Sequence, residues 1–256
     1  MSFIFYAQSI DTATLTYSSV AETGYPLANM QDRNKNSTFY DNVAGAMNEN
    51  LVIDLGSARA CNYLILGNYL AVTMGTITLT IQCNSSNSWP GIEAKAATSI
   101  LAMSMTNSLL TFNSQNYRYW RLVFTSSTDV LIGVSTLFLG TYYTLARTPE
   151  LIPNNNSGYN VLLNESLGGN RFGYIANTTV REIWEYEFNY ITDTEKTYME
   201  TWRDQIYISD GLSRYPFFYS PDSGTTLRYV RSNGLLNFEE LTYGAYKVNI
   251  RLEQEL

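Results

Sequence analysis

Three glutamates lie close together in the second half of the chain and are the first candidates for chemistry. Glu182, Glu185 and Glu187 belong to a stretch of alternating apolar and polar residues that predicts a β-strand. Because side chains alternate between the two faces of a strand, Glu185 and Glu187 are expected on one face and Glu182 on the other. A glycoside hydrolase requires two carboxylates about 5–9 Å apart in a cleft. A solvated strand face explains all three glutamates, so we expect no enzyme.

Other catalytic residue types are few. The chain contains no histidine, which excludes the usual Ser-His-Asp and Cys-His catalytic arrangements and the common zinc sites. Its two cysteines, Cys61 and Cys83, fall near predicted strand ends. They could form a disulfide if they are adjacent, but two buried thiols are favoured, and two cysteines do not make a disulfide scaffold.

The composition predicts a folded, strand-rich protein. A length of 256 residues suits one large or two ordinary domains. A hydrophobic content of 45% is enough for packed cores, and 21 tyrosines with frequent Thr, Val and Ile favour strands over helices. We therefore expect a mainly β protein.

The charge is acidic and unevenly distributed. Residues 1–149 carry 7 Lys and Arg against 8 Asp and Glu, or −1, and residues 150–256 carry 9 against 15, or −6. The absence of a basic patch predicts no binding to nucleic acid, whereas the acidic half could face a basic partner or simply solvent. No segment approaches the roughly 20 apolar residues of a membrane span, and the N-terminus lacks a signal peptide, so we expect synthesis in a cytoplasm.

The first half has regularly spaced strand patterns. Residues 51–56, 63–67, 77–82, 117–124 and 134–139 are predicted strands, and their spacing indicates an antiparallel β-sandwich. Residues 84–108, rich in Ser, Ala and Asn, are predicted to form a long connection with a helical turn at residues 94–97.

The second half has one clear helix signal. Thr192 followed by Glu195 fits a capping box, which predicts a helix at residues 193–206. The side chains expected on its buried face are Tyr198, Met199, Trp202 and Ile206. A stretch with two prolines and three asparagines predicts a linker at residues 143–156, between a first domain at 1–142 and a second at 157–256.

Four segments of the first half form a pattern. They are a polar turn at residues 31–39, a strand ending in Asp54-Leu55-Gly56, an aromatic and basic strand at 117–122, and Leu137-Phe138-Leu139-Gly140. In these segments the first half resembles the discoidin, or galactose-binding-like, family. The resemblance covers about residues 25–140 and implies a jelly-roll β-sandwich.

This resemblance also implies ligands, because many members bind glycans and some carry a structural calcium ion. Asp32 and Asn34 could hold calcium, or they could form an Asx turn without metal. No other cofactor is expected. A glycan would need exposed aromatic rings on loops, for which Trp89, Tyr69 and Tyr40 are the candidates.

The second half contains six segments in a characteristic order. They are the turn Leu167-Gly168-Gly169, a strand reaching residue 190, the predicted helix, a Pro-Phe strand at 215–218, the Pro221-Asp222 turn and an acidic final strand at 248–255. In these segments the second half is similar to phage tail and baseplate proteins of the distal-tail or minor-tail type. The order of the segments implies a sheet backed by one helix. It also implies a structural role in the virion tail, with copies assembled in a ring that docks other tail proteins.

The residues expected to act in assembly are charged. Four arginines could pair with acids of neighbouring copies or within their own sheet, and two glutamates end the last strand; these are Arg181, Arg228, Arg231, Arg251, Glu253 and Glu255. Two functions stay open. The first is a structural component of a phage virion, made in the host cytoplasm, and the second is a carbohydrate-binding module that contacts the host surface.

Overall fold

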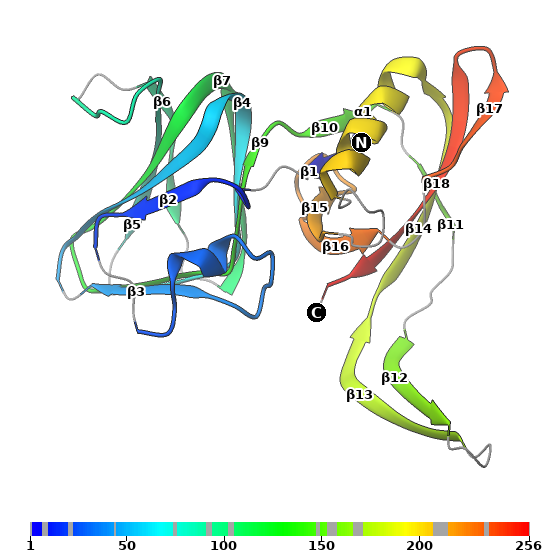
Figure 1. Cartoon of the computed structure of the whole chain (residues 1–256), viewed down its shortest axis with the longest axis horizontal. Helices are drawn as coiled ribbons and strands as arrows, with labels where there is room; N and C mark the ends of the chain where they lie inside the picture. Colours follow the sequence, from blue (N-terminus) through cyan, green and yellow to red (C-terminus); the bar gives the residue numbers. More distant parts are fainter. Residues whose placement is uncertain are drawn as a thin grey trace. The chain divides into compact units, whose positions relative to one another are not determined.

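The protein is mainly β-structure, as the composition predicts (Figure 1). The computed structural model describes residues 2–6, 10–19, 23–43, 45–73, 76–90, 94–101, 105–146, 149–152, 158–165, 171–206, 215–232 and 236–255. The chain divides into two compact units, Tyr6–Tyr142 and the combination of Met1–Phe5 with Tyr143–Leu256. We call them the sandwich unit and the helix-and-sheet unit.

The sandwich unit is an antiparallel β-sandwich. Its strands are β2 (Thr14–Tyr17), β3 (Phe39–Val43), β4 (Met47–Thr73), β5 (Ile77–Asn84), β6 (Ala94–Leu101), β7 (Met105–Ser126), β8 (Val130–Val134) and β9 (Thr136–Gly140), with a short 3₁₀ helix η1 (Leu27–Met30). The ladder runs β3-β8-β4-β7-β5-β6. The long strand β4 pairs with β7 through three register shifts and also pairs with β2, β8 and β9.

Alternating side chains fill the sandwich core. Along β5, Ile77, Leu79, Ile81 and Cys83 are buried while the residues between them are partly exposed. This confirms the predicted alternation, since burial of one face supplies the hydrophobic stabilisation of a sandwich. Trp120 of β7 joins the same core.

The Asp-Leu-Gly segment marks a bend in β4. The Asp54 carboxylate accepts hydrogen bonds from Nε and Nη2 of Arg118 at 2.7 and 2.8 Å, and Asp54 Oδ1 also accepts the Gly56 N–H at 2.8 Å. Gly56 has a φ of +77°, which a side chain rarely tolerates. The register with β7 shifts directly after Asp54, so these residues turn β4 where the sequence pattern placed a strand end.

The helix-and-sheet unit is built on an antiparallel sheet of order β10-β1-β15-β16-β18-β14-β11, with β17 paired to β18. Its strands are β1 (Phe3–Tyr6), β10 (Tyr143–Leu145), β11 (Glu150–Ile152), β14 (Ile183–Thr192), β15 (Phe217–Ser220), β16 (Arg228–Ser232), β17 (Phe238–Thr242) and β18 (Ala245–Gln254). A separate two-stranded ribbon consists of β12 (Gly158–Glu165) and β13 (Arg171–Arg181).

Helix α1 (Asp193–Ile206) has the predicted bounds. The capping box is formed, because Glu195 N–H donates to Thr192 Oγ1 at 3.3 Å and Thr192 N–H donates to Glu195 Oε2 at 2.9 Å. Met199 and Trp202 are buried as predicted, but Tyr198 is 44% exposed. Tyr198 lies at the margin of the apolar stripe, so its assignment to the buried face was wrong. Among the described residues, no helix is long and apolar enough to cross a membrane.

Aromatic rings fill the core beneath α1. The Trp202 ring stacks on Phe5 with centroids 4.3 Å apart and meets Phe217 edge-on at 5.1 Å. Phe3 contacts Phe188 edge-on at 5.3 Å and stacks on Tyr219 at 5.2 Å. The N-terminal strand is therefore part of the second core, which is why this unit is not one continuous segment.

Two regions differ from the sequence-based expectations. The predicted connection at residues 84–108 contains β6 and the start of β7, and its predicted helical turn lies within β6, so both predictions were wrong. The small and polar residues of β6 are typical of a loop, and the segment forms a strand because it pairs with β5. Of the predicted linker at 143–156, residues 143–145 and 150–152 form β10 and β11 of the helix-and-sheet unit, and residues 153–156 lie outside the described residues.

Candidate functional site

One partly exposed tryptophan is held in a fixed position on the sandwich unit. Trp89 lies in the loop that follows β5, and its indole Nε1–H donates to Asn87 Oδ1 at 3.0 Å. The guanidinium carbon of Arg121 lies 4.4 Å from the ring centroid, which is cation–π geometry. Arg121 Nε–H also donates to Gln82 Oε1 at 2.7 Å. We call these four residues, Trp89, Asn87, Arg121 and Gln82, the Trp89 platform.

Strand pairing explains why this platform forms. Gln82 of β5 lies directly opposite Arg121 of β7. Their neighbours Ile81, Cys83 and Trp120 are buried, so alternation directs Gln82 and Arg121 to the outer face. The loop that carries Trp89 is in turn braced by Asn84, whose Nδ2–H donates to the Ser88 carbonyl at 2.6 Å. The result is an aromatic ring with amide and guanidinium groups beside it.

The other two predicted aromatic candidates behave differently. Tyr40 is half-buried in β3 and meets the exposed ring of Tyr25 edge-on, with centroids 4.7 Å apart. A Cβ at Gly133 would lie 2.3 Å from Tyr40 Cε1, so the glycine leaves room for that ring. Tyr69 is only 3% exposed and belongs to the core, so it cannot offer a ring face to a ligand.

The predicted calcium residues form two successive Asx turns. Asp32 Oδ1 accepts the Asn34 N–H at 2.8 Å, and Asn34 Oδ1 accepts the Asn36 N–H at 3.0 Å. Calcium normally takes six to eight oxygen ligands (about 2.3–2.6 Å). Within the described residues, no group of three or more His, Cys, Asp or Glu side chains is placed to hold a metal ion. One oxygen of each side chain is thus engaged by a backbone N–H, which makes these turns a poor fit to the ion, and the calcium stays a prediction.

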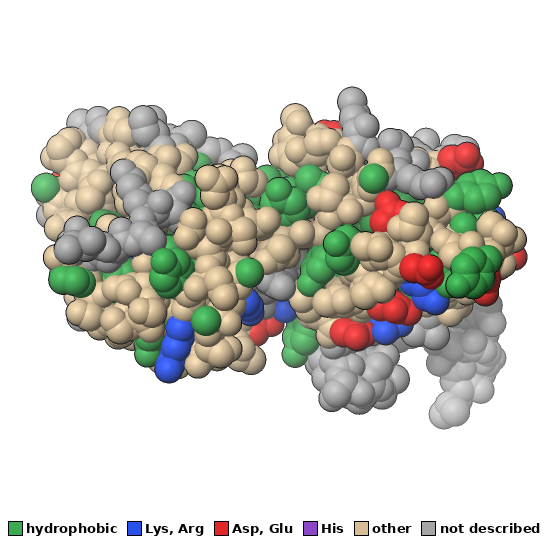
Figure 2. All heavy atoms as spheres, turned by 90° about the horizontal axis from the view of Figure 1, so that it is seen from above, with side chains coloured by type: hydrophobic (Ala, Val, Ile, Leu, Met, Phe, Trp, Pro, Cys, Tyr) green, Lys and Arg blue, Asp and Glu red, His purple; other side chains and the backbone are tan. Residues whose placement is uncertain are grey.

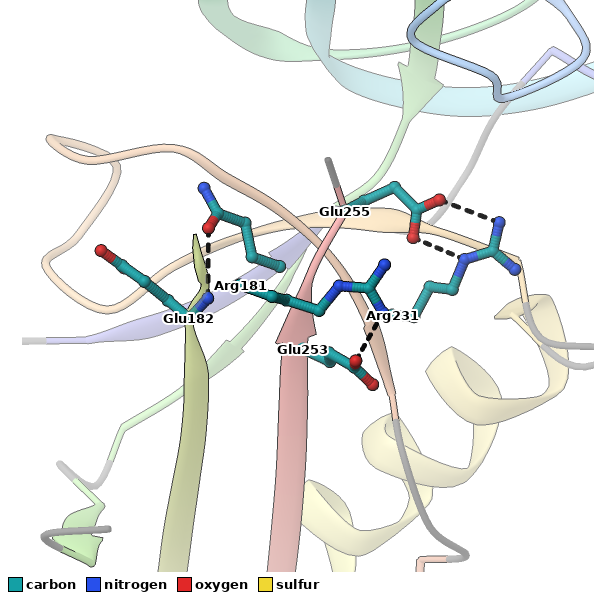
Figure 3. Close-up of polar contacts among 6 residues, drawn as sticks. Arg181, Glu182, Arg231, Glu253 and Glu255 are labelled. Atoms are coloured by element: carbon teal, nitrogen blue, oxygen red, sulfur yellow. Dashed lines mark hydrogen bonds and ion pairs between the residues drawn. The ribbon is translucent and has the colours of Figure 1, made fainter. Parts of the chain in front are cut away.

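The predicted assembly residues pair within the helix-and-sheet unit. Arg181 Nη1 lies 2.5 Å from Glu253 Oε1, and Arg231 Nε lies 2.6 Å from Glu255 Oε2 (Figure 3). Arg251 Nε lies 3.5 Å from Glu185 Oε1. Figure 2 shows carboxylates and cations side by side on one face of this unit. The local pairing that the sequence left open is therefore present in the structure, and the assembly role stays a prediction.

Arg228 differs from these three arginines. Its Nη1–H donates to the Tyr219 hydroxyl at 3.1 Å, and its guanidinium carbon lies 4.4 Å from the Trp184 ring centroid. The Tyr219 hydroxyl also lies 3.2 Å from the Tyr186 hydroxyl. Burial is the main cause that raises the pKa of Tyr219 well above its ordinary value, so this phenol stays neutral and accepts the Arg228 hydrogen bond.

The three glutamates do not form an acid–base pair. Glu187 Oε2 lies 2.9 Å from Lys247 Nζ, and that hydrogen bond holds the pKa of Glu187 below its ordinary value. Glu185 pairs with Arg251, and Glu182 is exposed between β13 and β14. A general acid needs a raised pKa, whereas Lys247 lowers the pKa of Glu187. Glu185 and Glu187 are therefore engaged in ion pairs, and of the three glutamates only Glu182 is exposed.

The two cysteines are buried free thiols, as the composition favoured. Burial raises the pKa of the Cys61 thiol to about 11 and that of the Cys83 thiol to about 11. Thiols in this state are weak nucleophiles because little thiolate is present. They form part of the sandwich core and not of a reactive site.

Comparison with known proteins identifies similar solved structures, while no family model and no curated protein matches the chain. A chitosan-binding module from Paenibacillus sp. IK-5 is 16% identical with a TM-score of 0.42, covering 52% of this chain and 99% of the module. A CBM32 module from Clostridium perfringens in complex with GalNAc-β-1,3-galactose is 14% identical with a TM-score of 0.44, covering 53% and 99%.

A further similar structure is the family 32 carbohydrate-binding module of NanJ from C. perfringens in complex with galactose. It is 18% identical with a TM-score of 0.43 and covers 54% of this chain and 98% of the module. At these identities and TM-scores, the function of this chain has to be inferred from its own side chains.

Proposed function

We propose that the sandwich unit is a carbohydrate-binding module and that the Trp89 platform is its binding site. The observation that carries this proposal is the partly exposed Trp89 ring, fixed by the Arg121 guanidinium at 4.4 Å and by the hydrogen bond to Asn87. A ring that is already ordered loses little conformational entropy when a ligand stacks on it. Of the two functions that the sequence predicts, this geometry supports carbohydrate binding better.

The polar members of the platform explain how a sugar would be oriented. Pyranose rings present an apolar C–H face that packs on an aromatic ring and a rim of hydroxyls that needs hydrogen bonds. Gln82 and Asn87 carry amide groups and Arg121 carries a guanidinium, all beside the Trp89 ring. These groups match the hydroxyl rim of a neutral sugar.

The test is glycan binding by the full chain. We expect binding with a Kd between about 1 mM and 1 μM on a glycan array and by calorimetry, which corresponds to about 4 to 8 kcal/mol. Trp89→Ala should abolish it, whereas Tyr25→Ala, which removes an exposed ring elsewhere on the unit, should leave it unchanged. Equal binding by Trp89→Ala and the natural sequence would overturn the proposal, provided that both proteins melt at the same temperature.

The same titration addresses the predicted calcium. Binding that is lost on chelation and restored by calcium would assign a metal to the polar turn at residues 31–39. Binding that is unchanged by chelation would leave the turn as an Asx structure.

The phage-tail assignment, the ring of copies, the location in the virion and the absence of an enzyme activity stay predictions from the sequence. A carbohydrate-binding module on the outside of a tail would be compatible with them. The neighbours of this chain in an electron-microscopy map of an intact particle would decide the assignment.

A further inference from the structure

The arginines in the sheet of the helix-and-sheet unit are not equivalent. Arg181, Arg231 and Arg251 each have a glutamate carboxylate within 3.5 Å. Arg228 has no carboxylate at salt-bridge distance anywhere in the part of the chain that the structure describes; its hydrogen bond goes to the neutral Tyr219 hydroxyl. The Arg228 guanidinium is half-buried and donates to a neutral hydroxyl, so an anionic ligand could still pair with it, which makes this position a candidate binding site.

The surroundings hold the Arg228 guanidinium in place. Arg228 on β16 lies opposite Tyr219 on β15, and the hydrogen bond between them spans 3.1 Å. The Trp184 ring lies under the guanidinium at 4.4 Å and meets the Tyr219 ring edge-on at 6.0 Å. Tyr219 is fully buried and is fixed by Phe3 and Tyr186, so two ordered rings position one cation.

Most hydrogen-bonding capacity at this position is unused by the protein. A guanidinium has five N–H donors in a planar fork, and one of them donates to Tyr219. The indole Nε1–H of the partly exposed Trp184 is a second potential donor at this position. A ligand that carries hydrogen-bond acceptors would match these donors.

We propose that Arg228, with Trp184 and Tyr219, forms a binding site for a small ligand that carries a carboxylate, such as a uronic acid. The planar fork of arginine matches a carboxylate with two parallel hydrogen bonds, and the partly exposed Trp184 ring offers apolar surface for the rest of the ligand, while the buried Tyr219 positions the guanidinium. This site is made by different residues from the Trp89 platform and does not depend on the proposed function.

A carboxylate fits better than a phosphate because of the local charge. The nearby Glu182 carboxylate acts on Arg228, and residues 150–256 carry 9 basic against 15 acidic side chains, or −6. A phosphate dianion would be repelled more strongly than a monoanion and would have a single guanidinium to bind. The other source of a carboxylate is an acidic side chain of a partner protein, which the experiment separates.

The experiment compares sugars that differ only in the carboxylate. Galacturonate and galactose are titrated into the full chain, and so are glucuronate and glucose, while the indole N–H signal of Trp184 is followed by NMR and assigned with Trp184→Phe. A charged hydrogen-bond pair predicts a roughly 10- to 100-fold tighter Kd for the uronates. The preference should shrink as salt is raised.

Two variants locate the effect. Arg228→Met should remove the uronate preference, so that uronate and hexose bind alike, whereas Arg251→Met, which removes an arginine already paired with Glu185, should keep it. Trp89→Ala should also keep it, which separates this site from the glycan platform. Unchanged melting temperatures and NMR spectra check that the variants fold.

Two results would overturn the proposal. The first is equal binding of uronates and hexoses, or a preference that survives in Arg228→Met. The second is Arg228-dependent binding of a glutamate-rich peptide without binding of either uronate, which would assign the site to a protein partner instead.

Discussion

The two units fill their interiors with different kinds of side chain. The sandwich core is largely aliphatic and comes from alternating strands such as β5, with Trp120 as its one tryptophan among the described residues. The helix-and-sheet core is built from stacked and edge-on rings, with Trp202 between Phe5 and Phe217. An aliphatic core tolerates repacking, whereas a ring core depends on a few large contacts.

The difference between the two cores changes how the partly exposed rings of Trp184 and Trp89 are interpreted. In the helix-and-sheet unit, aromatic residues are common in the core, so the residue type of Trp184 does not indicate a site. Its contact with the Arg228 guanidinium, which has no carboxylate partner among the described residues, does. In the sandwich unit, Trp89 lies outside an interior that is already filled. Its position is explained by a surface role better than by packing.

The largest expected effect is the loss of Trp202. Its side chain is fully buried, so Trp202→Ala should destabilise the helix-and-sheet unit by about 3–5 kcal/mol. Calorimetry should show an earlier transition for this unit while the sandwich transition is unchanged, and a shift of both transitions would contradict two independent cores. Trp202 Nε1–H has no acceptor in the described structure, so Trp202→Phe, which keeps the ring contacts, should cost much less.

The second prediction concerns the thiols of the aliphatic core. A pKa of about 11 for Cys61 and for Cys83, against an ordinary value of 9.0, leaves roughly 100-fold less thiolate near neutral pH, so the native thiols should react at least about 100-fold more slowly than in denaturant. The raised pKa values stabilise the neutral thiols in the folded protein. That stability is fully present below pH 9 and is lost as the pH rises through 11. Fast thiol labelling at pH 8 would contradict this.

The third prediction separates the helix cap from the ring core. Thr192→Ala removes the hydroxyl that accepts the Glu195 N–H, and we expect a loss of about 1 kcal/mol in the free energy of unfolding. Thr197→Ala, which removes an exposed hydroxyl within the helix, is the matched control and should change stability by less than about 0.5 kcal/mol. Chemical denaturation measures both, and equal losses would mean that the cap contributes nothing.

Local signals were readable from the sequence, and long-range pairings were not. The capping box and apolar stripe predicted α1 because both depend on residues within one or two turns. Strand β6 was missed because its Ala, Thr and Ser residues resemble a loop until β5 pairs with it. The membership of β1 in the second unit depends on its pairing with the distant strand β10, in which Ile4 lies opposite Thr144.

The same limit applies to the sites. Trp89 was predicted from its residue type, but its partner Arg121 is set by the β5–β7 register. Tyr69 was a candidate because an aromatic ring on a loop could bind a glycan, and only the fold shows that its ring belongs to the core. Arg228 can be distinguished from the paired arginines only when the position of every glutamate in the sheet is known. A local sequence pattern does not contain that information.

The smallest expected effect is electrostatic. The hydrogen bond with Lys247 lowers the pKa of Glu187 from its ordinary 4.5, so the folded state favours the carboxylate. Its stabilisation is present above pH 4.5 and is lost as the pH falls through the lowered pKa. Glu187→Gln should therefore flatten the acid limb of the stability curve for the helix-and-sheet unit, and salt should reduce the difference because the pair is near the surface. Glu182→Gln, an exposed glutamate outside any ion pair of the described residues, is the control. If both substitutions flatten the acid limb equally, the effect reflects net charge and not the Glu187–Lys247 pair.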